Sequence, residues 1–265
     1  VRELKARNGG ELYFPSGEYR ITTRRRAALL LDGLSDVTVR FAPGAVLLMD
    51  NLQKDGKGGG HGVVVRGPAA NIRLENVHVK WAVKASSRSS GDAFRFEGFP
   101  DDAKTISRIY LLNCTGENSP QTGAVFMGCS DIFVNNFSPV NTWADGLHFN
   151  ACRNDSVHRS GVSGVRLKNF RTDGCRWRFR TFRDCAVEQA AIAGAPFLLI
   201  GDDAPVKPEE SARLAANRTR LHGAALPGAM QEIQKCGDLD VRKVTITGTP
   251  AGAVFVRQTF DSSFR

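Results

Sequence analysis

Hydrophobic and polar positions alternate along most of the chain in a short phrase that recurs. Most copies begin with a small or polar residue and an Asp or Asn, and continue with alternating apolar positions toward an Asn. The copies lie at 35–39, 70–76, 107–113, 130–136, 163–169 and 237–241. Alternation of this kind predicts β-strands that bury one face.

A second phrase, in which a glycine leads into a short alternating strand, interleaves with the first. Its copies lie at 61–65, 91–96, 123–127, 146–149 and 252–256. Two spacings define the period, because Asn113 to Asn136 and Gly123 to Gly146 both span 23 residues. Two or three short strands per period, separated by Gly, Asn and Ser corners, predict one coil of a solenoid.

Stacked coils about 4.8 Å apart would pair every strand with the strand above it. Val, Ile, Leu and Phe would fill the interior, and Asn at the corners tolerates the left-handed backbone and can form ladders. We therefore predict an all-β fold, a right-handed parallel β-helix of about nine coils that forms a single domain over 1–265. The alternative is a β-sandwich with chance periodicity, although sandwich hairpins do not repeat at this interval.

The N-terminal residues predict a cap for the solenoid. Residues 1–7 predict a short helix, and Asn8-Gly9-Gly10 predicts its end through a left-handed cap. Such a capping helix would cover the open first coil, whose strand edges otherwise favour aggregation.

The segment 171–235 is irregular, because it is rich in Ala and Arg, loses the phrase and contains a helix-like run at 208–216. Two interpretations stay open for it, a real insertion and a local frameshift.

The charge balance narrows the class of partner. The chain has 36 Lys and Arg against 27 Asp and Glu, a formal net charge of +9. This excess suggests an anionic partner, and an evenly spread surface charge is the alternative. No helix-turn-helix, zinc-finger or RNP pattern is present, so nucleic acid is not predicted as a partner. No apolar run approaches the length of a membrane span, so none is predicted.

The cysteines follow the same period. Cys129, Cys152 and Cys175 recur at intervals of 23 residues. Equivalent corners on successive coils would bring them within disulfide range, and a ladder of buried thiols is the slightly favoured alternative. No C-x-x-C or Cys/His spacing suggests zinc.

Two stretches resemble known families. The run Gly-Gly-Glu-Leu-Tyr-Phe-Pro-Ser-Gly-Glu-Tyr-Arg-Ile at 9–21 resembles the opening coil of right-handed parallel β-helix proteins of the pectin-lyase type. The run Asn-Thr-Trp-Ala-Asp-Gly-Leu-His-Phe at 141–149 resembles the Asn-Thr-Asp-Gly segment of polygalacturonase-like family 28 glycoside hydrolases, with two residues inserted. The resemblance covers roughly 1–170 and 236–258. It implies a β-helix fold and polysaccharide hydrolysis.

The resemblance implies a pair of catalytic carboxylates. Inverting hydrolysis uses one carboxylic acid to protonate the leaving oxygen and one carboxylate to activate water. Asp145 matches the first position, and a corner Asp that accepts backbone hydrogen bonds is the alternative for it. The family's Gly-Asp-Asp motif is expected near 168–180 and is disrupted there, so Asp173 is the nearest second carboxylate. Gly201-Asp202-Asp203 has the right letters but would need a long insertion to reach the same face.

Three more residues are candidates for substrate binding. Asn141 and Trp143 precede the strand that begins near Gly146, and His148 lies on it. Trp143 could stack on a sugar ring, and Arg or Lys side chains could pair with uronate carboxylates. A surface role is an equal alternative for His148.

Together these features predict a polygalacturonase-like glycoside hydrolase for an acidic or pectin-type polysaccharide, and leave open whether this chain is active. A non-catalytic carbohydrate-binding or surface β-helix protein is one alternative, and a polysaccharide lyase is another. Neither a metal nor a cofactor is predicted. No signal peptide is visible at residues 1–7, and a secreted or cell-surface location is expected.

Overall fold

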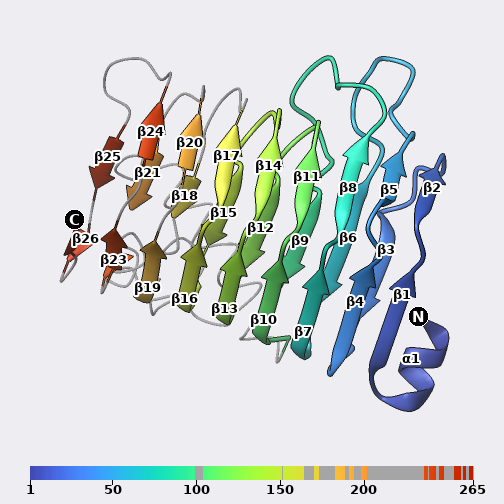
Figure 1. Cartoon of the computed structure of the whole chain (residues 1–265), viewed down its shortest axis with the longest axis horizontal. Coiled ribbons are helices and arrows are strands. Elements are labelled where there is room, and N and C mark those ends of the chain that lie inside the picture. Colours follow the sequence, from blue (N-terminus) through green and yellow to red (C-terminus); the bar gives the residue numbers. More distant parts are fainter. Residues whose placement is uncertain are drawn as a thin grey trace, which may run out of the picture.

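The computed structural model describes residues 1–98, 104–150 and 152–163 and, further along the chain, separate strands between 170 and 264. Side chains are described within these ranges as far as residue 160, except at 150, 153–155 and 158. The strands form three sheets that run the length of an elongated molecule, together with one short two-stranded pair (Figure 1). Each turn of the chain contributes one strand to each of the three sheets in succession.

Sheet A contains nine strands. They are β1 (Gly10–Phe14), β4 (Val37–Phe41), β7 (Ala69–Glu75), β10 (Ile106–Leu112), β13 (Cys129–Asn135), β16 (Arg153–His158), β19 (Arg183–Glu188), β23 (Leu239–Arg242) and β27 (Ser263–Phe264). Sheet B contains eight strands. They are β2 (Gly17–Ile21), β5 (Ala45–Met49), β8 (His78–Trp81), β11 (Thr115–Glu117), β14 (Ser138–Val140), β17 (Gly161–Ser163), β20 (Ala191–Ala193) and β24 (Thr245–Thr247).

Sheet C contains eight strands and carries the site described below. They are β3 (Ala27–Asp32), β6 (His61–Arg66), β9 (Phe94–Glu97), β12 (Ala124–Met127), β15 (Leu147–Asn150), β18 (Phe170–Thr172), β21 (Leu198–Gly201) and β25 (Val254–Arg257). The short pair is β22 (Cys236–Gly237) with β26 (Thr259–Phe260). Neighbouring strands are parallel and cycle by threes, so the predicted parallel β-helix is confirmed.

The register explains the period of the sequence. Ile109 pairs with Ile132 in sheet A, which is one step of 23 residues. Ile72 pairs with Ile109, a step of 37, because the chain adds a loop between β8 and β9 and a longer connection before β10. The extra residues of this turn therefore fall between the strands and leave the pairing of β7 with β10 intact.

Aromatic and aliphatic side chains fill the interior as one continuous core. Phe96, Phe126 and Phe149 occupy equivalent positions on β9, β12 and β15. Their rings stack with centroids 4.5 Å and 5.1 Å apart, and all three side chains are fully buried. A strict repeat of one large residue per coil therefore gives a stacked ladder along the axis.

Asparagines form ladders at the corners, as the sequence predicts. Asn76, Asn113 and Asn136 all have left-handed backbone, with φ of 58°, 53° and 55°. The Asn136 amide donates to Asn113 Oδ1 at 3.0 Å, and the Asn113 amide donates to Asn76 Oδ1 at 3.3 Å. Asn tolerates this conformation and pairs with its neighbour, so the same residue recurs at this corner.

The N-terminal helix is also confirmed. Helix α1 (Arg2–Arg7) ends at Asn8, which has φ 57° and ψ 37°, and the helix lies beside the first strand β1 at the end of the stack (Figure 1). Its Leu4 is buried and joins the core. The helix therefore covers apolar side chains of the first coil. No helix among the residues with described placement is long and apolar enough to cross a membrane.

Part of the irregular segment continues the solenoid. The backbone of β18, β19, β20 and β21 extends the three sheets in the same order. The helix-like run at 208–216 lies outside the described residues.

The three cysteines with described side chains are buried thiols. Cys129 and Cys152 lie on neighbouring coils, one residue before the pair Ser130 and Arg153, so the buried-thiol interpretation holds for these two. Burial raises the pKa of Cys114 to about 12. Cys175 lies outside the described residues.

We expect thiol reagents at about pH 8 to leave Cys114, Cys129 and Cys152 unmodified in the folded protein, because all three are fully buried and inaccessible to the reagent. Unfolding in urea should expose all three. Peptide-resolved mass spectrometry after alkylation measures each position separately. Rapid modification of any of the three before unfolding would contradict this expectation.

Candidate functional site

Asp145 lies at the corner that leads into β15 and is almost completely buried, with 4% of the residue exposed. Its Oδ2 lies 3.3 Å from Nδ1 of His148, three residues further on. Its backbone carbonyl accepts from the Gly123 amide and from the Thr142 hydroxyl. Two of the predicted site residues, Asp145 and His148, are therefore brought together as a pair.

Asp92 occupies the equivalent corner two coils toward the N-terminus. Phe94, Ala124 and Leu147 are aligned in sheet C, which places Asp92 and Asp145 each two residues before an aligned position. Two strand spacings correspond to about 10 Å between their backbones. The cation three residues after Asp92 is Arg95, so the two corners share one pattern, a carboxylate followed at the third position by a basic side chain.

The Asp92 carboxylate is fully buried and held by several donors. Arg95 Nη1 lies 2.8 Å from Oδ2, the Thr122 amide donates to Oδ1 at 3.0 Å, and His61 Nδ1 lies 3.3 Å from Oδ2. Burial opposes ionisation, but the hydrogen bonds and charges of His61 and Arg95 outweigh it and lower the pKa of Asp92 below its ordinary value. Asp92 is therefore an ionised structural partner of the two basic side chains.

Glu97 is the second buried carboxylate of this face, with 3% of its side chain exposed. Arg26 Nη2 lies 2.6 Å from each of its oxygens, Arg95 Nε donates at 2.6 Å, and Arg66 Nε donates at 3.3 Å. Burial raises the pKa of Glu97, but the hydrogen bonds and charges of Arg95 and Arg26 outweigh that effect and lower it overall. One carboxylate thus joins guanidinium groups from three successive coils.

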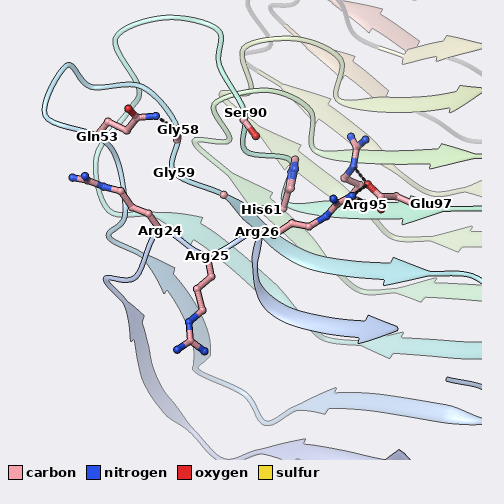
Figure 2. A pocket seen from close by; sticks show the side chains of 11 residues that line it. Arg24, Arg25, Arg26, Gln53, Gly58, Gly59, His61, Ser90, Arg95 and Glu97 are labelled. Atoms are coloured by element: carbon pink, nitrogen blue, oxygen red, sulfur yellow. Dashed lines mark hydrogen bonds and ion pairs between the residues drawn. The ribbon is translucent and has the colours of Figure 1, made fainter. Parts of the chain in front are cut away.

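A pocket of about 450 Å³ opens beside this network (Figure 2). It is bounded by the segment that precedes β3, the run that precedes β6, and side chains of β6 and β9. The lining residues that matter for its chemistry are Arg24, Arg25, Arg26, His61, Arg95 and Glu97. The lining of the pocket is therefore strongly basic, and Glu97 is the single carboxylate among its lining residues.

Glycine is required where the chain passes under the pocket. A Cβ placed on Gly58 would lie 1.5 Å from the Ser90 carbonyl oxygen, and one on Gly60 would lie 2.0 Å from the Arg25 carbonyl oxygen. These contacts are backbone contacts that cannot move aside. The glycine run therefore lets three segments of the chain approach closely enough to form the pocket.

His61 presents a defined face to this pocket. His61 Nδ1 lies 3.0 Å from the Asp92 backbone nitrogen and 3.3 Å from Asp92 Oδ2, so this ring nitrogen is directed at the Asp92 corner. Among the described residues, no group of three or more His, Cys, Asp or Glu side chains could hold a metal ion.

The other predicted substrate-binding residues occupy structural positions. The Asn141 amide donates to Asn118 Oδ1 at 3.4 Å in a corner ladder, with φ 56° at Asn141. The half-buried Trp143 donates its indole N–H to the Ala85 carbonyl at 3.0 Å, which ties its corner to the loop before β9. Asp173 and Asp202 lie outside the described residues.

Sequence reasoning missed Asp92, Arg95 and Glu97 as members of the site. The sequence contained a signal for Asp92. Asp-Ala-Phe-Arg-Phe at 92–96 and Asp-Gly-Leu-His-Phe at 145–149 share the same order of residue types: an Asp, a small residue, an apolar residue, a basic residue and a Phe. No comparable signal marked Glu97. Its importance depends on three arginines from different coils that converge on it.

Comparisons with known proteins add little to this geometry. No family model and no curated protein matches the chain. Among solved structures, it is similar to a putative glycosyl hydrolase from Parabacteroides merdae ATCC 43184, with 13% identity over 96% of this chain and 88% of that chain and a TM-score of 0.27. Because the TM-score is this low, the function proposed below depends on the residues of the site.

Proposed function

We propose that this parallel β-helix protein binds an acidic polysaccharide on the outer face of sheet C, with the arginine pocket as the part that contacts its carboxylates. The basic lining of the pocket is the observation that supports this proposal. A guanidinium group pairs with a carboxylate through two parallel hydrogen bonds, which favours uronates over neutral sugars. A secreted or cell-surface location belongs to the same proposal, and fractionation of the producing cells tests it.

Arg25 is the most informative residue for this proposal. Its side chain is exposed in the pocket, and it forms no hydrogen bond or ion pair with any residue that the structure describes. Arg24 is also exposed, and its Nη2 donates a hydrogen bond to the Leu52 carbonyl at 3.2 Å. Cations that are not neutralised within the protein are available to an anionic ligand.

Binding fits the site better than cleavage does, because both carboxylates of the shared pattern are buried. A general acid or base must come within hydrogen-bond reach of the substrate or of a water molecule. Asp92 is fully buried and already engaged by Arg95 and His61. We therefore place binding first.

Hydrolysis is the second candidate, and one observation favours it. Asp92 and Asp145 lie two coils apart on one face, and their backbone separation of about 10 Å is near the carboxyl separation of about 6.5–9.5 Å in inverting enzymes. Movement of the corner at Asp145 would be needed to admit a sugar. In this second proposal Asp145 is one carboxylate, and Asp92 takes the place that the sequence assigned to Asp173.

Titration with polygalacturonate and with a neutral galactan of similar length tests the first proposal. We expect binding of the acidic polymer alone, and weaker binding as salt screens the charges. Equal binding of both polymers, or of neither, would rule it out. Reducing-end release with the wild type and with Asp145→Asn tests hydrolysis, and a rise in ultraviolet absorbance from an unsaturated product would indicate a lyase instead.

A further inference from the structure

We infer that the arginines of the pocket have two different roles, and that Glu97 is the positioning residue that holds part of them in place. Arg26 and Arg95 are held in the wall by Glu97, whereas Arg24 and Arg25 contact two carboxylates on different sugar residues of one chain. This inference rests on the proposed function and deepens it. It specifies the ligand as an oligouronide with at least two carboxylates, rather than a single small anion.

The wall of the pocket is backed by a network of ion pairs in which the positive and negative charges are equal in number. Three arginines, Arg26, Arg66 and Arg95, contact three carboxylates, those of Asp32, Asp92 and Glu97. Arg66 reaches Asp32 at 3.7 Å and Glu97 at 3.3 Å, and Arg95 reaches both Asp92 and Glu97. Three positive and three negative charges leave the wall formally neutral.

Arg24 and Arg25 therefore supply the two positive charges that the wall does not neutralise. Figure 2 shows their side chains leaving the backbone in different directions, while Arg26 extends toward Glu97. Two guanidinium groups that diverge in this way cannot both pair with one small anion. Two carboxylates carried by different residues of a sugar chain satisfy both.

Glu97 has the features of a positioning group. Its carboxylate is nearly inaccessible, with 3% of the side chain exposed, so it cannot meet the ligand directly. Without its charge, Arg26, Arg66 and Arg95 would repel one another across a short distance and leave their present arrangement. The pocket would then lose the shape that holds the ligand chain between Arg24 and Arg25.

This role leads to a result that simple charge attraction does not predict. Glu97→Gln removes one negative charge from a site for an anion, so attraction alone would tighten binding. Positioning predicts that Glu97→Gln weakens the binding of trigalacturonate about fivefold, and that Glu97→Asp restores part of it. Glu18→Gln is the matched control, because Glu18 is an exposed carboxylate paired with Arg20 and lies outside the pocket.

Arg25→Ala keeps the test decisive if Glu97→Gln does not fold, because Arg25 is exposed and its loss leaves no buried group unpaired. Isothermal titration should show trigalacturonate binding about tenfold more weakly to Arg25→Ala and unchanged binding to Arg7→Ala, which removes the same charge from helix α1. Monogalacturonate and inorganic sulfate should bind the wild type at least about tenfold more weakly than trigalacturonate.

Three results would overturn the inference while leaving the proposed function intact. These are equal or tighter binding by folded Glu97→Gln, equal loss in Arg25→Ala and Arg7→Ala, and equal affinity for the monosaccharide and the trisaccharide. Failure of the wild type to bind any polyuronate would instead overturn the proposed function itself.

Discussion

Replacing Phe126 with alanine is expected to lower the free energy of unfolding by about 3–5 kcal/mol. Phe126 lies between Phe96 and Phe149, with ring centroids 4.5 Å and 5.1 Å away, and is fully buried. Its removal opens a cavity and breaks both ring contacts of the ladder. Neighbouring coils cannot close the gap without losing their backbone register, because parallel hydrogen bonds fix it.

Urea unfolding followed by circular dichroism measures this loss. Tyr13→Ala is the matched control, because it also removes an aromatic ring from a strand, and Tyr13 is 54% exposed. We expect the control to change the free energy of unfolding by less than about 0.5–1 kcal/mol. Similar losses for both variants would mean that the stacked ring ladder does not stabilise the solenoid as described.

The fold could be predicted because its determinants are local and repeat. Each coil needs its own inward apolar residues and its own corner, so the same requirement returns with each coil, twice at an interval of 23 residues, and becomes visible in the sequence. Asn113 and Asn136 show this most directly, since each has left-handed backbone and each pairs with the next coil. The cap at Asn8 is equally local and was equally predictable.

The site was only partly predictable, because its contacts join residues far apart in the sequence. Arg26 and Glu97 are separated by 71 positions, and nothing near either residue indicates the other. Trp143 offers a similar lesson. Its indole N–H reaches the Ala85 carbonyl, 58 residues away, in a loop whose course no pattern specifies, and its stacking on a sugar stays a prediction.

The solenoid itself explains how charged groups from distant segments gather on one face. Strands that are three apart in sequence are neighbours in one sheet, so aligned residues on successive coils lie about 4.8 Å apart along the axis. Charged residues at aligned positions can therefore lie beside one another. His61, Asp92 and Asp145 belong to one such row, and Arg95 and His148 belong to another row, three positions further along the strands. The carboxylates of Asp92 and Asp145 on the first row lie beside the basic side chains of Arg95 and His148 on the second, which allows these groups to be buried together.

Asp92→Asn is expected to lower the free energy of unfolding at pH 7 by about 3 kcal/mol. The amide can still accept from the Thr122 N–H, but Arg95 loses a buried anionic partner at 2.8 Å. Asp50→Asn is the control, because Asp50 forms an Arg–carboxylate contact of similar length, 2.9 Å with Arg20, between side chains that are 43% and 53% exposed. Exposed pairs contribute about 1 kcal/mol or less, so the control should change little.

The pH dependence of this difference tests the protonation state of Asp92. Its folded-state pKa is lowered, whereas in the unfolded chain it is about 3.9. A lowered pKa means that the carboxylate contributes stability above the unfolded value, and that this contribution disappears as the pH falls through the folded value. The difference in unfolding free energy between the wild type and Asp92→Asn should therefore be constant between about pH 5 and 7 and shrink below about pH 4. Guanidinium chloride titrations at each pH measure it. A difference that grows on acidification would mean that Asp92 is protonated in the folded protein, and that the pairs with Arg95 and His61 do not hold it as an anion.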